Sequence, residues 1–268
     1  MTRMLCLITG IALLAMCFCG EVAAAADQVS VPVLVYHRFG PSVADSMTVT
    51  TAVFESQLKW LKANGYTVIP LRTLVNYLGG AGPPPPPRSV VITADDAHIT
   101  VYTEMLPIVR RYGIPVTLFI YPSAVSNASY AMTWEQLQEL KQTGQFELQS
   151  HTYWHPNFKK DKKKSKPAEY QKEVDTQLSK SRTVLEKHFG TTVDLLAWPF
   201  GIYDDELEKD AAKAGYVAAF SIDRRHASKS EKIMAEPRYL MVNGDGTKGF
   251  EAIVTGRAQE KGHKTYAQ

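Results

Sequence analysis

The feature that most constrains the fold is a regular alternation of short apolar runs with longer amphipathic segments. Seven runs rich in β-branched or aromatic residues predict strands, and helical patterns follow most of them. The expected strands are residues 31–36, 66–69, 89–93, 115–121, 146–150, 193–198 and 217–223. Strands separated by helices usually pair in parallel, so the alternation favours an α/β barrel or an open α/β sheet.

Start and stop residues bound the expected helices. Thr133 and Gln136 have the spacing of a capping box, which predicts a helix after residue 133. Gly113 and Gly190 stand where two other helical patterns end, as expected for residues that adopt left-handed conformations easily. The apolar positions between residues 170 and 185 recur at helical spacing and predict one long helix.

Composition limits the class of protein. The 268 residues are 45% hydrophobic and 21% charged, as in a folded globular chain, and the net charge of +3 gives no support for nucleic-acid binding. Residues 1–26 have the form of a secretory signal, with Arg3, an apolar stretch and a small-residue end at 23–26. We therefore expect a periplasmic or secreted protein without stable membrane insertion after cleavage, with one catalytic domain at 27–256 and a flexible tail at 257–268.

Two segments interrupt the alternation. Residues 83–87 are five consecutive prolines, which favour an extended spacer between elements. Residues 159–166 hold six lysines, which we interpret as a solvated loop, with attraction to an anionic envelope polymer as the alternative. All three cysteines lie within residues 1–26, so any metal site in the rest of the chain must use His, Asp or Glu.

Polar residues gather where the expected strands end. His37 follows the first strand, Asp95 and Asp96 the third and His151 the fifth, and Asp223 ends the last. The carboxyl ends of parallel strands meet on one face, where α/β barrels place their active sites. Unpaired buried charges are costly, so packing alone does not explain this convergence, and an enzyme is favoured.

His151 and His155 are four residues apart, which in a helical turn places both imidazoles within reach of one cation. Capping or packing would equally explain such a pair taken alone. Asp95 and Asp96 follow a strand that should be buried, so with a metal one carboxylate would coordinate while its neighbour acts as base. Two histidines and one carboxylate leave positions open for water and substrate, as in hydrolytic metal sites.

The segments SVVITADDAH, QSHTYWHP and LLAWPFGIYDD resemble, in order and spacing, the signature segments of polysaccharide deacetylases, the NodB-homology domain of carbohydrate esterase family four. The resemblance extends from about Val31 to Leu240. The start of the domain, VPVLVYHRFG, further resembles the biofilm poly-N-acetylglucosamine deacetylase subgroup, in which the segment of the catalytic acid lies at the N-terminal end.

The resemblance implies a role for each of these residues. Asp95 would be the general base and His37 the acid that protonates the departing amine. Asp96, His151 and His155 would bind one divalent transition metal, with zinc favoured over nickel, cobalt and iron. The backbone near Phe200 in the turn with Pro199 would stabilise the oxyanion. Further residues are expected to contact the substrate or to support the base: Tyr36, Trp154, Trp198, Asp223 and Arg224.

The chain also departs from the family pattern. Ala97 stands where Gly usually follows the acid pair, and an Arg that often steadies the base is missing before Trp198. Arg224, or as second choice Arg225, is the expected substitute, paired with Asp223 or Asp95; an ordinary surface ion pair is the alternative. His98 is close enough to replace a metal ligand, although we favour a hydrogen-bonding role at the rim. Residues 240–243 lack a late histidine, as expected if His37 is the acid.

We therefore expect a distorted (β/α) barrel of about seven mainly parallel strands with its active site at their C-terminal ends. The expected activity is metal-dependent N-deacetylation of a polysaccharide that contains N-acetylglucosamine, with release of acetate. Two alternatives stay open at this point: hydrolysis of a small or cyclic amide, and glycan binding with little activity. The sequence identifies no protein partner and gives no indication of nucleic-acid binding.

Overall fold

The computed structural model describes residues 29–258. The expected signal peptide at 1–26 and most of the expected tail at 257–268 lie outside the described residues. Within the described part, no helix combines the length and apolar character needed to cross a membrane.

The centre of the fold is a parallel sheet in which β6 to β10 lie side by side in chain order, while β2 and β12 follow β6 at the other edge. Its hydrogen-bonded order is β10, β9, β8, β7, β6, β2 and β12, and β5 pairs with the start of β6. All pairings in this sheet are parallel. The strands are β2 (Val33–Tyr36), β5 (Thr67–Val68), β6 (Ser89–Ala94), β7 (Val116–Ile120), β8 (Phe146–Ser150), β9 (Leu195–Ala197), β10 (Ala218–Phe220) and β12 (Tyr239–Leu240).

The segment that ends in β12 contacts both edges of the sheet. Glu236 forms a parallel bridge with Phe220 of β10, and three residues later Tyr239 pairs with Leu34 of β2. This segment therefore curls the sheet into a distorted barrel and confirms the expected α/β architecture. Its two-residue strand carries no sequence pattern of its own, which is why β12 was not among the expected strands.

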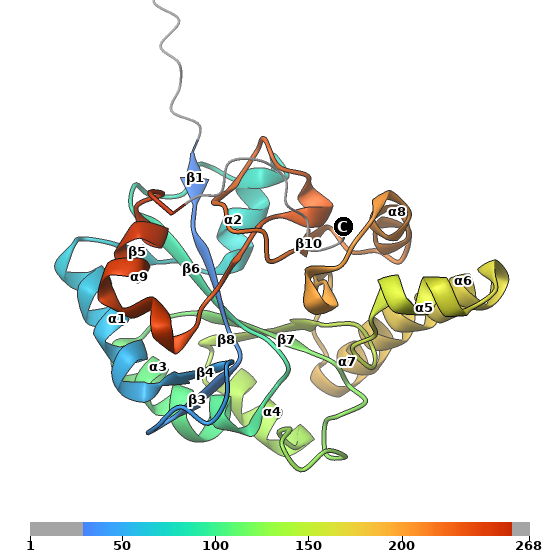
Figure 1. The fold of residues 1–268 in the computed structure, drawn as a ribbon, viewed down its shortest axis with the longest axis horizontal. Helices are drawn as coiled ribbons and strands as arrows, with labels where there is room; N and C mark the ends of the chain where they lie inside the picture. The colour runs from blue at the N-terminus through green and yellow to red at the C-terminus, as the bar shows by residue number, and fades with distance from the viewer. Residues whose placement is uncertain (1–28, 259–268) are drawn as a thin grey trace, which may run out of the picture.

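The helices surround the strands (Figure 1). α1 and α9 come from opposite ends of the chain and pack side by side (Figure 1). The α-helices are α1 (Thr51–Ala63), α2 (Leu71–Leu78), α3 (Leu106–Tyr112), α4 (Trp134–Gln142), α5 (Phe158–Lys164), α6 (Pro167–Asp175), α7 (Ser181–Phe189), α8 (Asp205–Lys213) and α9 (Gly246–Val254). π-helical turns at Val101–Met105 and Thr176–Lys180 precede α3 and α7.

Local signals in the sequence explain several helix boundaries. The capping box of Thr133 and Gln136 begins α4, and α3 and α7 end at Gly113 and Gly190 with φ values of 63° and 62°. The prediction of a loop at 159–166 was wrong, because α5 covers most of it. Phe158 supplies the buried anchor of α5, while Lys162 pairs with Asp204 and Glu206.

Two small pairings lie beside the main sheet. β1 (Ser30–Val31) pairs antiparallel with β11 (Ala227–Ser228), and β3 (Arg38–Gly40) pairs in parallel with β4 (Thr48–Thr50). β3 follows His37 directly, so this pairing holds the chain just after the first polar residue of the expected site.

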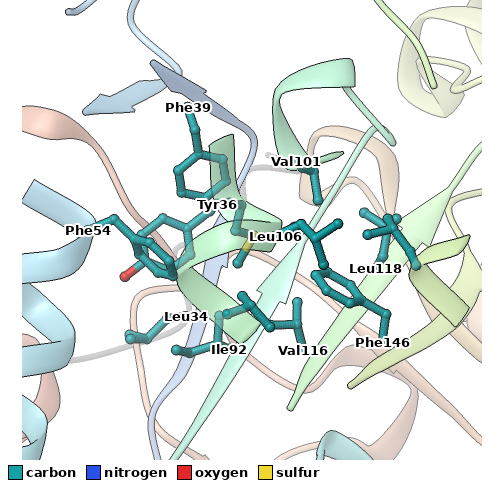
Figure 2. Packing of buried hydrophobic residues seen from close by; sticks show 14 of the residues in the cluster. Leu34, Tyr36, Phe39, Phe54, Ile92, Val101, Leu106, Val116, Leu118 and Phe146 are labelled. Atoms are coloured by element: carbon teal, nitrogen blue, oxygen red, sulfur yellow. The ribbon is translucent and has the colours of Figure 1, made fainter. Parts of the chain in front are cut away.

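Between the barrel and the helices α1 and α3 lies a core that includes Tyr36. Tyr36 is fully buried, and its ring centroid lies 5.7 Å from that of Phe39 and 5.1 Å from that of Phe54 (Figure 2). Its hydroxyl donates to Gln57 Oε1 at 2.8 Å. The expectation that Tyr36 contacts the substrate was therefore wrong: alternation along β2 turns this side chain into the core.

Candidate active site

The carboxylate pair lies directly after β6, at the C-terminal end of a fully buried strand. Asp95 is buried, whereas Asp96 is partly exposed. Asp96 and Ala97 both have positive φ values, 74° and 53°. Ala97 therefore adopts the conformation that Gly takes easily, and this turn directs the two neighbouring carboxylates differently.

His151 follows β8, two strands along the sheet from β6. Its Nδ1 lies 2.7 Å from the carbonyl oxygen of Ala197, an acceptor, so Nδ1 carries the proton and donates it. The unprotonated Nε2 is thereby presented to the carboxylates, 3.6 Å from Asp96 Oδ1 and 3.8 Å from Asp95 Oδ2. A histidine oriented in this way by a backbone carbonyl is typical of metal ligands.

Asp96, His151 and His155 form the candidate metal cluster. One ligand atom from each lies within 4.8 Å of the others, and His155 Nε2 is 3.7 Å from Asp96 Oδ1. Two ligands about 2.1 Å from one ion at a tetrahedral angle lie roughly 3.4 Å apart. The geometry and the tautomer of His151 thus fit one divalent transition metal.

The two histidines reach this cluster without a helix. Residues 151–157 have no helical structure, and Thr152 and His155 have φ values of 65° and 59°. Gln177 Oε1 accepts hydrogen bonds from the N–H groups of Tyr153 and Trp154, at 2.9 and 3.0 Å, and so fixes the loop. The helical turn expected from the four-residue spacing was wrong, although the imidazoles do come together, with ring centroids 4.7 Å apart.

Arg238 holds Asp95. It lies in the segment that closes the barrel and is fully buried. Its Nη1 and Nη2 donate to the two oxygens of Asp95 at 2.9 and 2.8 Å, and its Nε donates to Ser221 O at 3.1 Å. Nη1 also lies 3.2 Å from Thr93 Oγ1. This bidentate contact gives Asp95 one fixed orientation.

Arg238 also determines the ionisation of Asp95. Burial raises the pKa of the Asp95 carboxyl, but the Arg238 guanidinium outweighs that effect and lowers the pKa to about 2. Asp95 is therefore a carboxylate throughout the neutral range.

The expectation that Arg224 or Arg225 supports Asp95 was wrong, because Arg238 makes this contact. Arg224 lies 3.5 Å from Leu240 O, and Arg225 pairs with Glu231 at 3.0 Å. Asp223 is buried, where it accepts hydrogen bonds from Ser221 and Tyr203. Sequence reasoning missed Arg238 because no motif surrounds it; its one signal is a single basic residue beside the apolar run 239–242.

His37 lies at the end of β2, in the same pocket as the carboxylates. Its Nδ1 is buried and has no hydrogen-bond partner among residues 29–258. Burial lowers the pKa of the His37 imidazole, while Asp96 and Asp95 act in the opposite direction. A lowered pKa makes the protonated ring a stronger acid.

The turn Pro199–Gly201 places Phe200 at the rim. Phe200 is 50% exposed, has a φ of 57° and packs edge-on against His155 with ring centroids 4.5 Å apart. Gly201 has a φ of 66°, and a Cβ there would lie 2.5 Å from Ile222 Cγ1. Only glycine fits this position without displacement of its neighbours.

Backbone strain concentrates around this pocket. Seven non-glycine residues between 29 and 258 have positive φ, and five of them belong to the segments just described: Asp96, Ala97, Thr152, His155 and Phe200. Such conformations cost roughly 1–3 kcal/mol each and persist where surrounding contacts enforce them. Their clustering is typical of a functional site.

These residues surround a pocket of about 650 Å³. Trp198 lines the pocket, but it is 1% exposed and its Nε1 donates to Met234 O, so the indole is not available to stack on a sugar. A larger cavity of about 720 Å³ lies between α5 and the start of α8, away from the metal cluster. The pocket residues are His37, Arg38, Met47, Asp95, Asp96, His98, Tyr121, Tyr130, His151, His155, Trp198, Phe200, Gly201, Ile222 and Leu240.

The family model and two curated relatives match most of the described chain. The sequence model of the family described as polysaccharide deacetylase matches residues 82–219. A poly-β-1,6-N-acetyl-D-glucosamine N-deacetylase of Staphylococcus aureus is 29% identical over 199 residues, which cover 72% of this chain and 68% of the relative. The protein of the same name from Staphylococcus epidermidis is 27% identical over 220 residues, 80% of this chain and 74% of the relative.

Solved structures share the fold. The Streptococcus pyogenes deacetylase PplD, in complex with acetate, superposes with a TM-score of 0.75 at 22% identity, over 85% of this chain and 99% of that one. IcaB from Ammonifex degensii gives a TM-score of 0.72 at 21% identity, over 84% and 96% of the two chains.

Proposed function

Because the chain belongs to the polysaccharide deacetylase family, we propose that it removes acetyl groups from a β-1,6-linked polymer of N-acetylglucosamine and that the pocket between His37 and Phe200 performs this reaction. The observation that carries the proposal is the pairing of a metal-type cluster, Asp96, His151 and His155, with a carboxylate that Arg238 keeps ionised. The reaction class, metal-dependent hydrolysis of an N-acetyl amide on a polysaccharide, is that of the family.

Asp95 is the proposed base. It accepts a proton from the water that attacks the acetamide carbonyl, and Arg238 keeps its two oxygens in place for that transfer. A divalent cation held by Asp96, His151 and His155 would polarise the carbonyl and lower the pKa of the water.

A hydrogen-bond donor for the developing oxyanion is available in the Pro199–Gly201 turn. The Gly201 N–H donates to Trp198 O and the Ile202 N–H donates to Pro199 O. Pro199 itself has no N–H. The Phe200 N–H is therefore the donor that this turn has left, and we assign it to the oxyanion.

His37 is the proposed acid. An amine leaves a tetrahedral carbon readily only when it is protonated, so a proton donor must lie near the leaving nitrogen. His37 lines the pocket together with Asp95, and its lowered pKa favours release of the proton to the amine.

The substrate assignment rests on the two relatives named above and on the position of His37. Both relatives act, by name, on poly-β-1,6-N-acetylglucosamine, and in this chain a pocket histidine follows the first strand of the sheet. Phe200 offers an exposed aromatic face at the rim on which a sugar ring can stack. We further propose that the enzyme works in the periplasm or outside the cell, because residues 1–26 have the form of a secretory signal.

The test is acetate release by metal-loaded protein from β-1,6-linked and β-1,4-linked N-acetylglucosamine oligomers and from peptidoglycan. We expect release from the β-1,6-linked oligomers, a loss of at least about a hundredfold in Asp95→Asn, and a similar loss in His37→Ala. Lys162→Ala is the control, because this residue pairs with Asp204 and Glu206 outside the pocket. Opening of a cyclic amide without acetate from any glycan would contradict the proposal, as would glycan binding with no acetate release.

A further inference from the structure

His98 lies in the pocket but has no part in the proton transfers or in the metal cluster. It follows the acid pair by two residues, is partly exposed and lines the same cavity as His37 and Phe200. We propose that His98 is a substrate-binding residue that donates a hydrogen bond from Nε2 to a ring hydroxyl of the sugar. This inference rests on the proposed function and adds a residue that selects and orients its substrate.

Thr100 determines which nitrogen of His98 carries the proton. The backbone N–H of Thr100 points at His98 Nδ1, 3.2 Å away, and a backbone N–H can only donate. His98 Nδ1 is therefore an acceptor, and the ring proton is on Nε2.

A second contact supports the same tautomer. Thr100 Oγ1 accepts a hydrogen bond from Phe39 N–H at 3.0 Å, so its own proton is free to go to His98 Nδ1, 2.9 Å away. Phe39 belongs to β3, which follows His37. Thr100 therefore links the wall that carries His98 to the segment that positions the proposed acid.

A series of side-chain contacts connects His98 to Phe200 through His155, one of the proposed metal ligands. Phe200 contacts His155, and His155 contacts Tyr121 with ring centroids 5.3 Å apart. The hydroxyls of Tyr121 and Tyr130 are 2.7 Å apart, and Tyr130 stacks on His98 at 6.1 Å with an interplanar angle of 13°.

The two ends of this series of contacts differ in chemistry. Phe200 presents an exposed apolar face, whereas both hydrogen bonds of the His98 ring within residues 29–258 are at Nδ1, which leaves the Nε2 N–H as a donor. A pyranose has the same division, because its C–H groups form apolar faces and its hydroxyls project from the ring edge. A sugar stacked at Phe200 with a hydroxyl at His98 Nε2 would span the ligand cluster.

The same tautomer argues against His98 as a substitute metal ligand. The nitrogen that faces away from Thr100 carries a proton, and the other accepts from Thr100, so neither has a free lone pair for a cation. The candidate cluster is complete without it.

The first experiment measures binding of β-1,6-linked tri-N-acetylglucosamine to the metal-free full chain by calorimetry. His98→Phe keeps a ring to stack on Tyr130 but removes the donor, and we expect a Kd about three- to tenfold higher, the loss of one hydrogen bond. His98→Gln places an amide N–H near the position of Nε2 and should restore most of the affinity. His188→Phe is the matched control, since His188 also stacks on an aromatic ring, Trp134 at 3.7 Å, but lies on the surface outside the pocket.

Two further measurements separate a hydrogen bond from packing. Two trimer analogues are compared, one without the 3-hydroxyl and one without the 4-hydroxyl. The natural protein should bind one of them more weakly than the parent trimer, the one that lacks the hydroxyl contacted by His98. His98→Phe should bind this analogue and the parent trimer with the same affinity. In the metal-loaded enzyme, His98→Phe should raise KM more than it lowers kcat. Imidazole ¹⁵N spectra of the natural protein should show the His98 proton on Nε2.

The inference is overturned if His98→Phe and the natural protein bind the trimer equally well, or if the natural protein does not bind it. It is also overturned if His98→Gln does not restore the affinity lost in His98→Phe, or if the His98 proton is on Nδ1. If trimer binding depends on His98 but the metal-loaded protein releases no acetate, the proposed function is contradicted while the binding role of His98 is supported.

Discussion

Replacement of Arg238 by methionine tests how the barrel supports its base. Arg238 is fully buried, and it is the arginine among residues 29–258 that forms an ion pair with Asp95. Methionine keeps most of the apolar volume but leaves Asp95 as a buried charge without its cation. Removal of one partner from a buried pair costs about 3–5 kcal/mol of unfolding free energy.

The same change should alter the pH dependence of activity. With Arg238 present, the pKa of Asp95 is about 2, below its ordinary value of 3.8. The Asp95 carboxylate therefore contributes stability that is complete above pH 3.8 and is lost as the pH falls towards 2, about 2.5 kcal/mol at 1.4 kcal/mol per unit. Asp95 of the natural protein therefore stays ionised throughout the range from pH 4 to 9. In Arg238→Met, burial acts without the opposing guanidinium and raises the pKa of Asp95 by about 1–3 units, so kcat/KM should begin to fall below about pH 5.

The assays are urea unfolding at pH 7 and acetate release between pH 4 and 9. Arg72→Met is the matched control, because Arg72 also contacts two carboxylates, Glu147 and Asp194, but its side chain is 32% exposed. Solvent screening should keep the cost of that change near 1 kcal/mol. The double variant Arg238→Met with Asp95→Asn should recover part of the lost stability and none of the activity.

An unfolding free energy for Arg238→Met within about 1 kcal/mol of the natural protein would refute this reasoning. A kcat/KM of Arg238→Met that does not fall below about pH 5 would show that Arg238 does not set the ionisation of the base.

Two further substitutions test other parts of the structure. Gly201→Ala should destabilise the fold by roughly 2–4 kcal/mol in urea unfolding, because its Cβ would meet Ile222 Cγ1 at 2.5 Å at a positive φ. Gly113→Ala, at a similar φ with no atom within 4 Å, should cost only about 1 kcal/mol, and equal losses would contradict the clash. Burial raises the pKa of Glu236 from 4.5 to about 8, so its contribution to stability is complete below pH 4.5 and is lost as the pH rises towards 8. At pH 7 the raised pKa of Glu236 lowers the free energy of unfolding by roughly 3 kcal/mol, and Glu236→Gln should abolish this loss. If the free energy of unfolding of the variant depends on pH as that of the natural protein does, this explanation is contradicted.

The parts of the fold that the sequence predicts are those with strong local patterns. Each of the seven expected strands contains or overlaps a strand of the parallel sheet, because buried parallel strands appear as continuous apolar runs. The capping box at Thr133 and the glycine stops of α3 and α7 also formed as expected.

The residues of the candidate metal cluster were also accessible from the sequence, although the choice of Asp96 over Asp95 came from the resemblance to the family. Asp96, His151 and His155 come together in the structure, since residues after parallel strands meet on one face of the sheet. The local conformation could not be predicted, because the segment around Thr152 is a loop and not the expected helical turn. Gln177 holds this loop through two hydrogen bonds, each to a residue more than 20 positions earlier in the chain.

The contact of Arg238 with Asp95 could not be predicted from the sequence. Its partner Asp95 lies 143 positions away in the chain, and the strand beside it has two residues, too short for a periodic signal. Arg224 was an attractive substitute only because it lies next to an expected strand end. The role of Tyr36 was missed for a related reason: alternation shows that neighbouring residues face opposite sides of a strand, but not which side is the pocket.

The most direct test of the account is cobalt binding followed by X-ray absorption spectroscopy. We expect one Co²⁺ per chain with two imidazole nitrogens about 2.1 Å from the ion. Replacement of Asp96, His151 or His155 by alanine should abolish stoichiometric binding, and replacement of His98 should leave the coordination unchanged. A fully reconstituted protein that holds no cobalt, or a spectrum without imidazole ligands, would contradict the proposal that this pocket is a metal-dependent hydrolytic site.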